Sequence, residues 1–95
     1  MKSELNKLAK FLKEKRTLAS LSQKDVATKL GYSTSQFISN WERGVSSPPI
    51  KVLKQISTLY KVNSDEVFNL ILEHSLTQLK SSMKKDYAAL VKRKK

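Results

Sequence analysis

The sequence predicts an all-α protein, in which a bundle of five helices is followed by an extension of the last helix. Three observations support this fold class. The 95 residues include only two glycines and two prolines, whereas sheet proteins usually need more turn residues. Apolar side chains recur at steps of three and four residues, which is the period of an amphipathic helix. Neither glycine nor proline follows Pro49, so no strong helix breaker occurs in the C-terminal part of the chain.

The first predicted helix lies between Ser3 and Arg16. Its apolar residues fall on one face and lysines occupy the other, as in a helix that packs on a core. The expected core residues of this helix are Leu5, Leu8, Phe11 and Leu12.

A second, short helix is expected to begin after Ser22. The hydroxyl of Ser22 can accept the amide of Asp25, while the Asp25 carboxylate reaches back toward the positive end of the helix. Gly31 ends this helix, because glycine adopts the left-handed geometry that other residues resist. Its apolar face consists of Val26, Ala27 and Leu30.

Two more short helices follow. Thr34 is the expected N-cap of a third helix that runs from about Ser35 to Glu42 and is closed by Gly44. Its inward pair is Ile38 and Trp41. Pro49 has the fixed φ angle that suits the first position of a fourth helix. The expected buried face of that helix is Leu53, Ile56, Leu59 and Tyr60.

The fifth helix is expected to be long. Asn63 or Ser64 caps it, Asp65 and Glu66 lie in its first turn, and no helix breaker follows through Val91. Its later part carries one continuous apolar stripe, formed by Leu72, Leu76, Leu79, Met83, Tyr87 and Leu90.

This apolar stripe needs a partner. The helix would run roughly 40 Å at about 1.5 Å per residue, which is longer than the fourth helix can cover. We expect the stripe to form the contact of a homodimer. The alternatives are that the segment folds back on its own domain or is partly frayed.

Composition excludes several classes of protein. The chain has the size of one domain and contains no cysteine, which removes disulfides, thiolate nucleophiles and thiolate zinc sites. His74 is the only histidine, has no second ligand nearby in sequence, and is interpreted as a residue on a helix surface. Both glycines end helices, so no phosphate-binding glycine loop remains. We therefore expect no enzymatic activity, no metal and no cofactor.

The charge distribution points to an acidic partner. The formal net charge is +11, and the last sixteen residues hold seven basic residues and one acidic residue, so over half of the excess lies there. Such a field attracts polyanions. No apolar run has the length of a membrane helix or the character of a signal peptide, so we expect a cytoplasmic protein without a membrane partner.

Two short helices joined by a turn after glycine are typical of the helix-turn-helix, whose second helix can enter the major groove of DNA. The segments SQKDVATKLG and SQFISNWERG resemble the phage-repressor and Cro type of this motif, the XRE family. The resemblance covers roughly residues 5–72 and implies a five-helix, lambda-repressor-like domain. It rests on Leu21, Ser22, Gln23, Ala27, Gly31, Ile38, Trp41, Glu42, Arg43, Gly44, Pro48, Leu53 and Ile56.

The chain departs from this family pattern at three places. Ser20 stands where the family usually has glycine, so either the connection avoids a left-handed residue or the serine adopts that conformation under strain. The interval from Gly31 to Gly44 is one residue longer than usual, and we place the extra residue in the turn. The segment after about Leu72 has no counterpart. We therefore divide the chain into a helix-turn-helix domain, residues 1–72, and a basic helical extension, residues 73–95.

Residues near the start of the third helix that do not face the core are expected to contact bases. They are Ser35, Gln36, Ser39 and Asn40. Gln36 and Asn40 lie four residues apart and so share one face, and an amide can both donate to and accept from adenine. Phe37 has two interpretations, contact with a thymine methyl group or packing.

Phosphate contacts are expected beside this surface. The resemblance implies that Gln23 touches phosphate and braces the glutamine of the recognition helix, and Lys24, Thr34 and Arg43 flank the same surface. The resemblance also implies a structural ion pair between Arg16 and Glu42.

These observations predict a sequence-specific, double-stranded DNA-binding transcriptional regulator, a repressor that binds operator half-sites as a homodimer. One alternative is a protein-interaction module of the same fold, such as an antitoxin or an anti-regulator, that acts mainly on a protein partner. Another alternative is binding to acidic membranes through the basic C-terminal helix.

Overall fold

The computed structural model describes the backbone of residues 2–93 and the side chains of residues 7–92. Lys94 and Lys95 of the basic C-terminal end, and the side chain of Leu5, lie outside the described residues. The helices are α1 (Lys2–Leu18), α2 (Gln23–Leu30), α3 (Gln36–Glu42), a 3₁₀ turn η1 (Ile50–Val52), α4 (Leu53–Tyr60) and α5 (Ser64–Arg93). Residues 2–93 contain no strand, so the predicted all-α fold class is confirmed.

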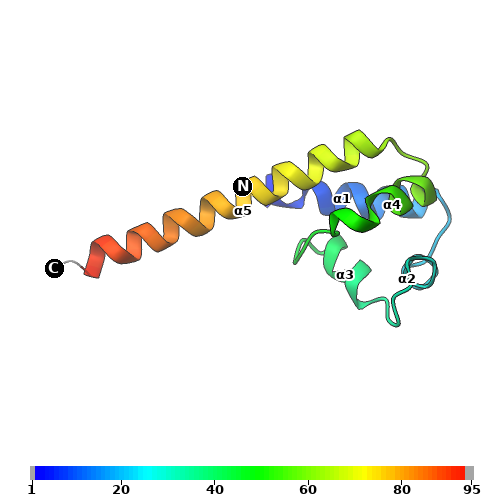
Figure 1. The fold of residues 1–95 in the computed structure, drawn as a ribbon, viewed down its shortest axis with the longest axis horizontal. Helices are drawn as coiled ribbons and strands as arrows, with labels where there is room; N and C mark the ends of the chain where they lie inside the picture. The colour runs from blue at the N-terminus through cyan, green and yellow to red at the C-terminus, as the bar shows by residue number, and fades with distance from the viewer. Residues whose placement is uncertain (1, 94–95) are drawn as a thin grey trace.

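The core lies where α1 packs against α3, α4 and the first half of α5, and where α2 packs against α3. Figure 1 shows α1 and α4 beside the first half of α5, with α2 and α3 on the side away from α5. The buried core residues are Leu8, Leu12, Val26, Ala27, Ile38, Trp41, Val52, Ile56, Tyr60, Val67 and Ile71.

The predicted reciprocal cap of α2 is confirmed. The Ser22 hydroxyl accepts the Asp25 amide, and the Asp25 carboxylate accepts the Ser22 amide, both at 2.9 Å. These hydrogen bonds lower the pKa of Asp25 below its ordinary value. At the start of α5, Asn63 is the capping residue, because its Oδ1 atom accepts the amides of Asp65 and Glu66.

Four helices (α1 to α4) end in the same way. Each is followed by one residue in the left-handed conformation, and two backbone hydrogen bonds close the last turn. In each, the left-handed amide donates to the carbonyl three residues back, and the next amide donates five residues back, as in a Schellman motif. Glycine holds this position after α2 and α3, at Gly31 (φ 86°) and Gly44 (φ 77°). After α1 and α4 the position is held by Ser20 (φ 59°) and Lys61 (φ 56°). Ser20 therefore adopts the strained conformation.

Two predicted helix starts are displaced. Pro49 is extended, with φ −68° and ψ 151°, and precedes η1 instead of opening α4, which begins at Leu53. The proline ring fixes φ but leaves ψ free, so it suits both arrangements. The N-cap of α3 is Ser35 and not Thr34, although the Thr34 hydroxyl still accepts the Gln36 amide at 3.2 Å.

The interpretation of His74 as a surface residue is wrong. Its side chain is buried beside the loop that follows α3, near Ser46 and Ser47, and its Nδ1 atom has no hydrogen-bond partner. His74 is three residues after Ile71 and seven after Val67, so it continues the face of α5 that packs on the domain.

The second half of α5 projects from the domain (Figure 1). The radius of gyration is 15.7 Å, against about 12 Å expected for a compact chain of this length. The segment neither folds back nor frays within the described residues, since α5 is helical to Arg93. Among residues 75–92 no described side chain is buried. No helix within residues 2–93 has the length and apolar character needed to cross a membrane.

Candidate nucleic-acid interface

The exposed face of α3 is held in place by its opposite face. Ile38 is fully buried and Trp41 is 3% exposed, so both anchor the helix in the core as predicted. Gln36, Asn40 and Arg43 are spaced by four and three residues and therefore lie on one face, directed away from the core.

The side chains of this face form one hydrogen-bonded network. Gln36 Nε2 donates to Asn40 Oδ1 at 3.1 Å, and Arg43 Nη2 donates to the same oxygen at 2.7 Å. Arg43 Nε also donates to Ser39 Oγ at 3.4 Å. Three of the four expected base-contacting residues are thus linked to Arg43. We refer to Gln36, Ser39, Asn40 and Arg43 as the α3 network.

Aromatic packing supports the turn between α2 and α3. The ring of Tyr32 lies 4.7 Å from the ring of Phe37 and 6.0 Å, edge-on, from that of Trp41, measured between centroids. Phe37 remains 48% exposed. Phe37 therefore packs on the turn with one side and keeps the other side available to a ligand.

Two of the expected phosphate contacts lie beside the N-terminal end of α3. Lys24 and Thr34 line one hollow between the start of α2 and the loop before α3, together with Thr28, Ser33 and Ser35. Lys24 and Thr34 are exposed, and Ser35 is half-buried.

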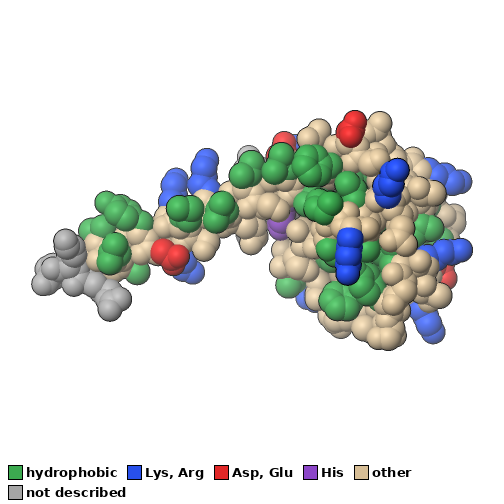
Figure 2. Space-filling model, viewed as in Figure 1, with side chains coloured by type: hydrophobic (Ala, Val, Ile, Leu, Met, Phe, Trp, Pro, Cys, Tyr) green, Lys and Arg blue, Asp and Glu red, His purple; other side chains and the backbone are tan. Residues whose placement is uncertain are grey.

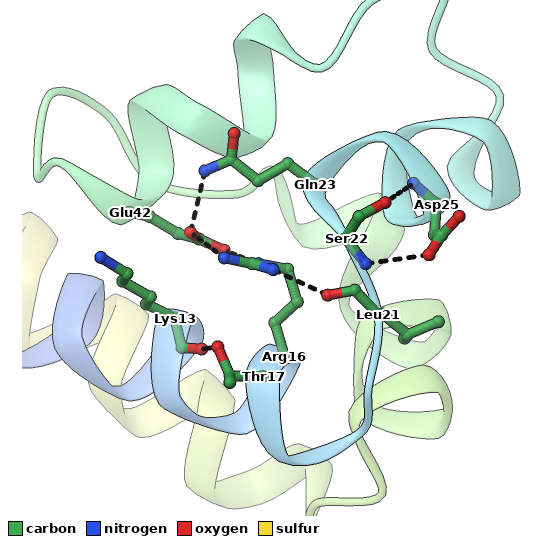
Figure 3. Close-up of polar contacts among 8 residues, drawn as sticks. All are labelled: Lys13, Arg16, Thr17, Leu21, Ser22, Gln23, Asp25 and Glu42. Carbon is green, nitrogen blue, oxygen red and sulfur yellow. Dashed lines mark hydrogen bonds and ion pairs between the residues drawn. The ribbon is translucent and has the colours of Figure 1, made fainter.

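Behind this surface lies an ion pair between Arg16 of α1 and Glu42 of α3 (Figure 3). Arg16 Nε donates to Glu42 Oε2 at 2.6 Å and Nη2 donates to Oε1 at 3.0 Å, so the contact is bidentate. Arg16 Nη1 also donates to the Leu21 carbonyl at 2.7 Å. The Glu42 side chain is only 3% exposed, and the pair therefore fixes how α3 and the start of α2 sit on α1.

Gln23 belongs to this ion-pair cluster. Its Nε2 atom donates to Glu42 Oε1 at 3.0 Å, whereas Gln36 donates to Asn40. The expected contact between Gln23 and Gln36 is therefore replaced by the hydrogen bond from Gln23 to Glu42. An ionised carboxylate is a stronger acceptor than a neutral amide.

Charge and burial act together around Glu42. The hydrogen bond to Glu42 raises the pKa of Arg16, against the opposing effect of burial. Burial, and then the charge of Glu42, raise the pKa of Tyr60 in the core. Arg16 therefore stays charged and Tyr60 neutral around neutral pH.

The place of Arg43 in the α3 network was not expected from the sequence, which indicated only a phosphate contact. Its spacing of three residues from Asn40 and seven from Gln36 was the available signal. Within residues 7–92, no three His, Asp or Glu side chains come together in a group that could hold a metal ion.

Comparison with known proteins identifies the family. A family model described as helix-turn-helix matches residues 12–67, which is more than half of the chain and includes α2, the turn and α3. No curated protein and no solved structure matches the chain. The chain therefore belongs to the helix-turn-helix family of Cro- and repressor-type, XRE-family, DNA-binding transcription regulators.

Proposed function

We propose that this protein is a sequence-specific, double-stranded DNA-binding repressor that binds operator half-sites as a homodimer. The observation that carries the proposal is the exposed polar face of α3, which the buried ion pair of Arg16 and Glu42 holds in a fixed orientation. A helix of this kind fits the major groove, which is about 12 Å wide.

We assign base contacts to Gln36, Ser39 and Asn40 of the α3 network. The amides of Gln36 and Asn40 can hydrogen bond to base edges, and the hydroxyl of Ser39 can contribute a contact directly or through water. Because their mutual hydrogen bonds already restrict their rotamers, these side chains lose less conformational freedom on binding than isolated surface side chains do.

We assign phosphate contacts to Lys24, Thr34 and Gln23. Lys24 and Thr34 line one hollow beside the N-terminal end of α3, and Gln23 is the first residue of α2. Such contacts fix the register of a protein on DNA without reading its sequence. The net charge of +11 supports this role, since phosphate neutralisation dominates the affinity for DNA.

The apolar stripe of α5 would form the contact between the two copies of the homodimer. Its six side chains are between 42% and 68% exposed (Leu72, Leu76, Leu79, Met83, Tyr87 and Leu90), and Figure 2 shows hydrophobic side chains continuing along the projecting part of α5. Burying a large apolar side chain stabilises a protein by about 1.5–3 kcal/mol, and one chain leaves these unburied. The domain packs on a different face of α5, through Val67, Ile71 and His74, so it leaves the stripe open to the α5 helix of a second copy.

Repression is the regulatory outcome that these parts support most directly. A protein that covers an operator excludes other proteins from the same duplex without needing a further contact surface. Activation would require an additional surface for the transcription machinery.

The test is a selection of duplexes from a random pool with the full-length protein, followed by a reporter assay on the selected sequence. We expect an inverted repeat whose half-sites lie about one helical turn, or a multiple of it, apart. We also expect reduced reporter expression when the protein is present. A pool without enrichment would contradict the proposal and favour a module that acts on a protein partner.

A further inference from the structure

We propose that Arg43 reads a guanine, and so sets sequence specificity together with Gln36 and Asn40. This inference rests on the proposed function and gives Arg43 a different role from the phosphate contact expected from sequence.

The position of the Arg43 side chain is the first observation. Arg43 follows the last residue of α3, and its side chain turns back along the helix to reach Ser39 and Asn40. The guanidinium therefore lies over the exposed face of α3, beside the amide of Asn40. A phosphate contact would not require the side chain to return along the helix, and the expected phosphate contacts Lys24 and Thr34 line a hollow at the opposite end of α3, beside its N-cap Ser35.

The donors of Arg43 are the second observation. A guanidinium carries five N–H groups and no acceptor. The Nε–H group donates to Ser39, and one N–H group of Nη2 donates to Asn40. Three N–H groups therefore remain for a ligand. Two parallel donors match the O6 and N7 acceptors of guanine, the commonest specific contact of arginine in the major groove.

The orientation of the Asn40 amide is the third observation. Because Arg43 can only donate, Asn40 must turn its oxygen toward Arg43, and that oxygen also accepts from Gln36. Both lone pairs of the oxygen are therefore in use, and Asn40 presents only its NH₂ group to DNA. Gln36 keeps its own oxygen and one N–H free for adenine. The face of α3 is thus rich in donors at the end near Arg43, which suits a guanine there.

The experiment uses the full chain and the operator obtained by selection. Each position of the operator is replaced in turn, and the affinity of each duplex and of random DNA is measured at several salt concentrations. For the wild-type protein, we expect loss of one G·C pair to weaken binding by about 5- to 150-fold. Arg43→Ala should bind the duplex with and without that pair almost equally while retaining discrimination at other positions. Arg43→Gln should change the preference at that position from guanine to adenine, because an amide matches the adenine edge.

Lys24→Ala is the matched control, since Lys24 is an exposed cation beside the N-terminal end of α3. It should keep every base preference and lower the slope of log affinity against log salt by about 0.9, the value for one phosphate contact. Arg43→Ala should leave that slope nearly unchanged. Arg43 is exposed, so both variants should melt as the wild type does.

Two outcomes would overturn the inference alone. Arg43→Ala could retain discrimination at every position, or it could weaken all duplexes equally with a slope reduced as in Lys24→Ala. A wild-type protein without any sequence preference would overturn the proposed function as well, which separates the two failures.

Discussion

The helix-turn-helix domain and the projecting half of α5 are both helical but are stabilised differently. The helices of the domain bury their apolar faces against one another, and four of them end in hydrogen-bonded left-handed caps. Along residues 79–92 every described side chain is exposed. Isolated helices of about 12–15 residues are marginal in water, so a helix of this length needs tertiary or quaternary packing. The domain is thus stabilised by contacts within one chain, whereas residues 79–92 have no buried side chain and would be covered only by the second copy that we propose.

Substitutions in the two regions should therefore act on different properties. A change in the domain should alter folding, and through folding the presentation of α3. A change on the stripe of α5 should alter assembly and leave the domain folded.

The largest effect is expected from placing charge in the apolar stripe. Leu79→Lys with Met83→Lys would bring like charges together between two copies of α5 and produce a folded monomer. Operator binding should weaken by about 10²- to 10⁴-fold, because two linked half-site contacts become independent. Sedimentation measures the assembly, and titration of the operator measures the binding.

The matched control adds two lysines to the opposite face of the same segment, as Ser81→Lys with Ala88→Lys. Both residues are exposed, and this variant should stay dimeric and bind the operator as the wild type does. If the stripe variant remains dimeric, or if the wild type sediments as a monomer, the dimer contact does not lie on this stripe.

The next effect is expected from breaking the buried ion pair. Glu42→Ala leaves Arg16 without its partner in a largely buried position and should lower the free energy of unfolding by about 3–5 kcal/mol. Urea denaturation measures this change. The exposed pair between Lys7 and Glu73, at 3.7 Å, is the control, and Lys7→Ala should cost less than about 1 kcal/mol. If both variants lost the same free energy of unfolding, the buried pair would be no more important for stability than the exposed pair.

A smaller effect is expected from truncating the amide side chains of the α3 network. Gln36→Ala and Asn40→Ala should each weaken operator binding by about 1–3 kcal/mol and leave binding to random DNA almost unchanged. Neither should alter the melting temperature, because both side chains point away from the core. Gln55→Ala, at an exposed glutamine of α4, should bind the operator normally. Wild-type operator binding by both α3 variants would remove these residues from the base-reading surface.

The smallest effect is expected at the two strained helix ends of the domain. Ser20→Gly and Lys61→Gly should each raise the free energy of unfolding by about 0.5–1 kcal/mol, because glycine adopts the left-handed conformation without the steric cost of a side chain. Gly31→Ala makes the reverse change, from glycine to a residue with a side chain, and should lower the free energy of unfolding. A Cβ atom there would meet no atom within 4 Å, so its destabilisation would report the conformation alone. A loss of stability in Ser20→Gly would mean that the serine side chain stabilises the turn.

Features that depend on near neighbours along the chain could be predicted from the sequence. The reciprocal cap of Ser22 and Asp25, the end of α2 at Gly31 and the inward pair Ile38 and Trp41 follow from spacing and from intrinsic backbone preferences. The continuous α5 follows from the absence of helix breakers. The site residues on α3 could be selected in the same way, by excluding those that face the core.

Features that depend on neighbours distant in sequence could not be predicted in this way, because they arise from contacts between elements. His74 is buried because α5 packs against the loop after α3, and Gln23 donates to Glu42 because α2 and α3 meet at that carboxylate. Ser20 and Lys61 adopt left-handed geometry because the packing of consecutive helices requires a sharp reversal, even where no glycine marks it. In each case a local preference was weaker than the free energy gained by packing and hydrogen bonding between elements, and that free energy depends on how the elements are arranged in space.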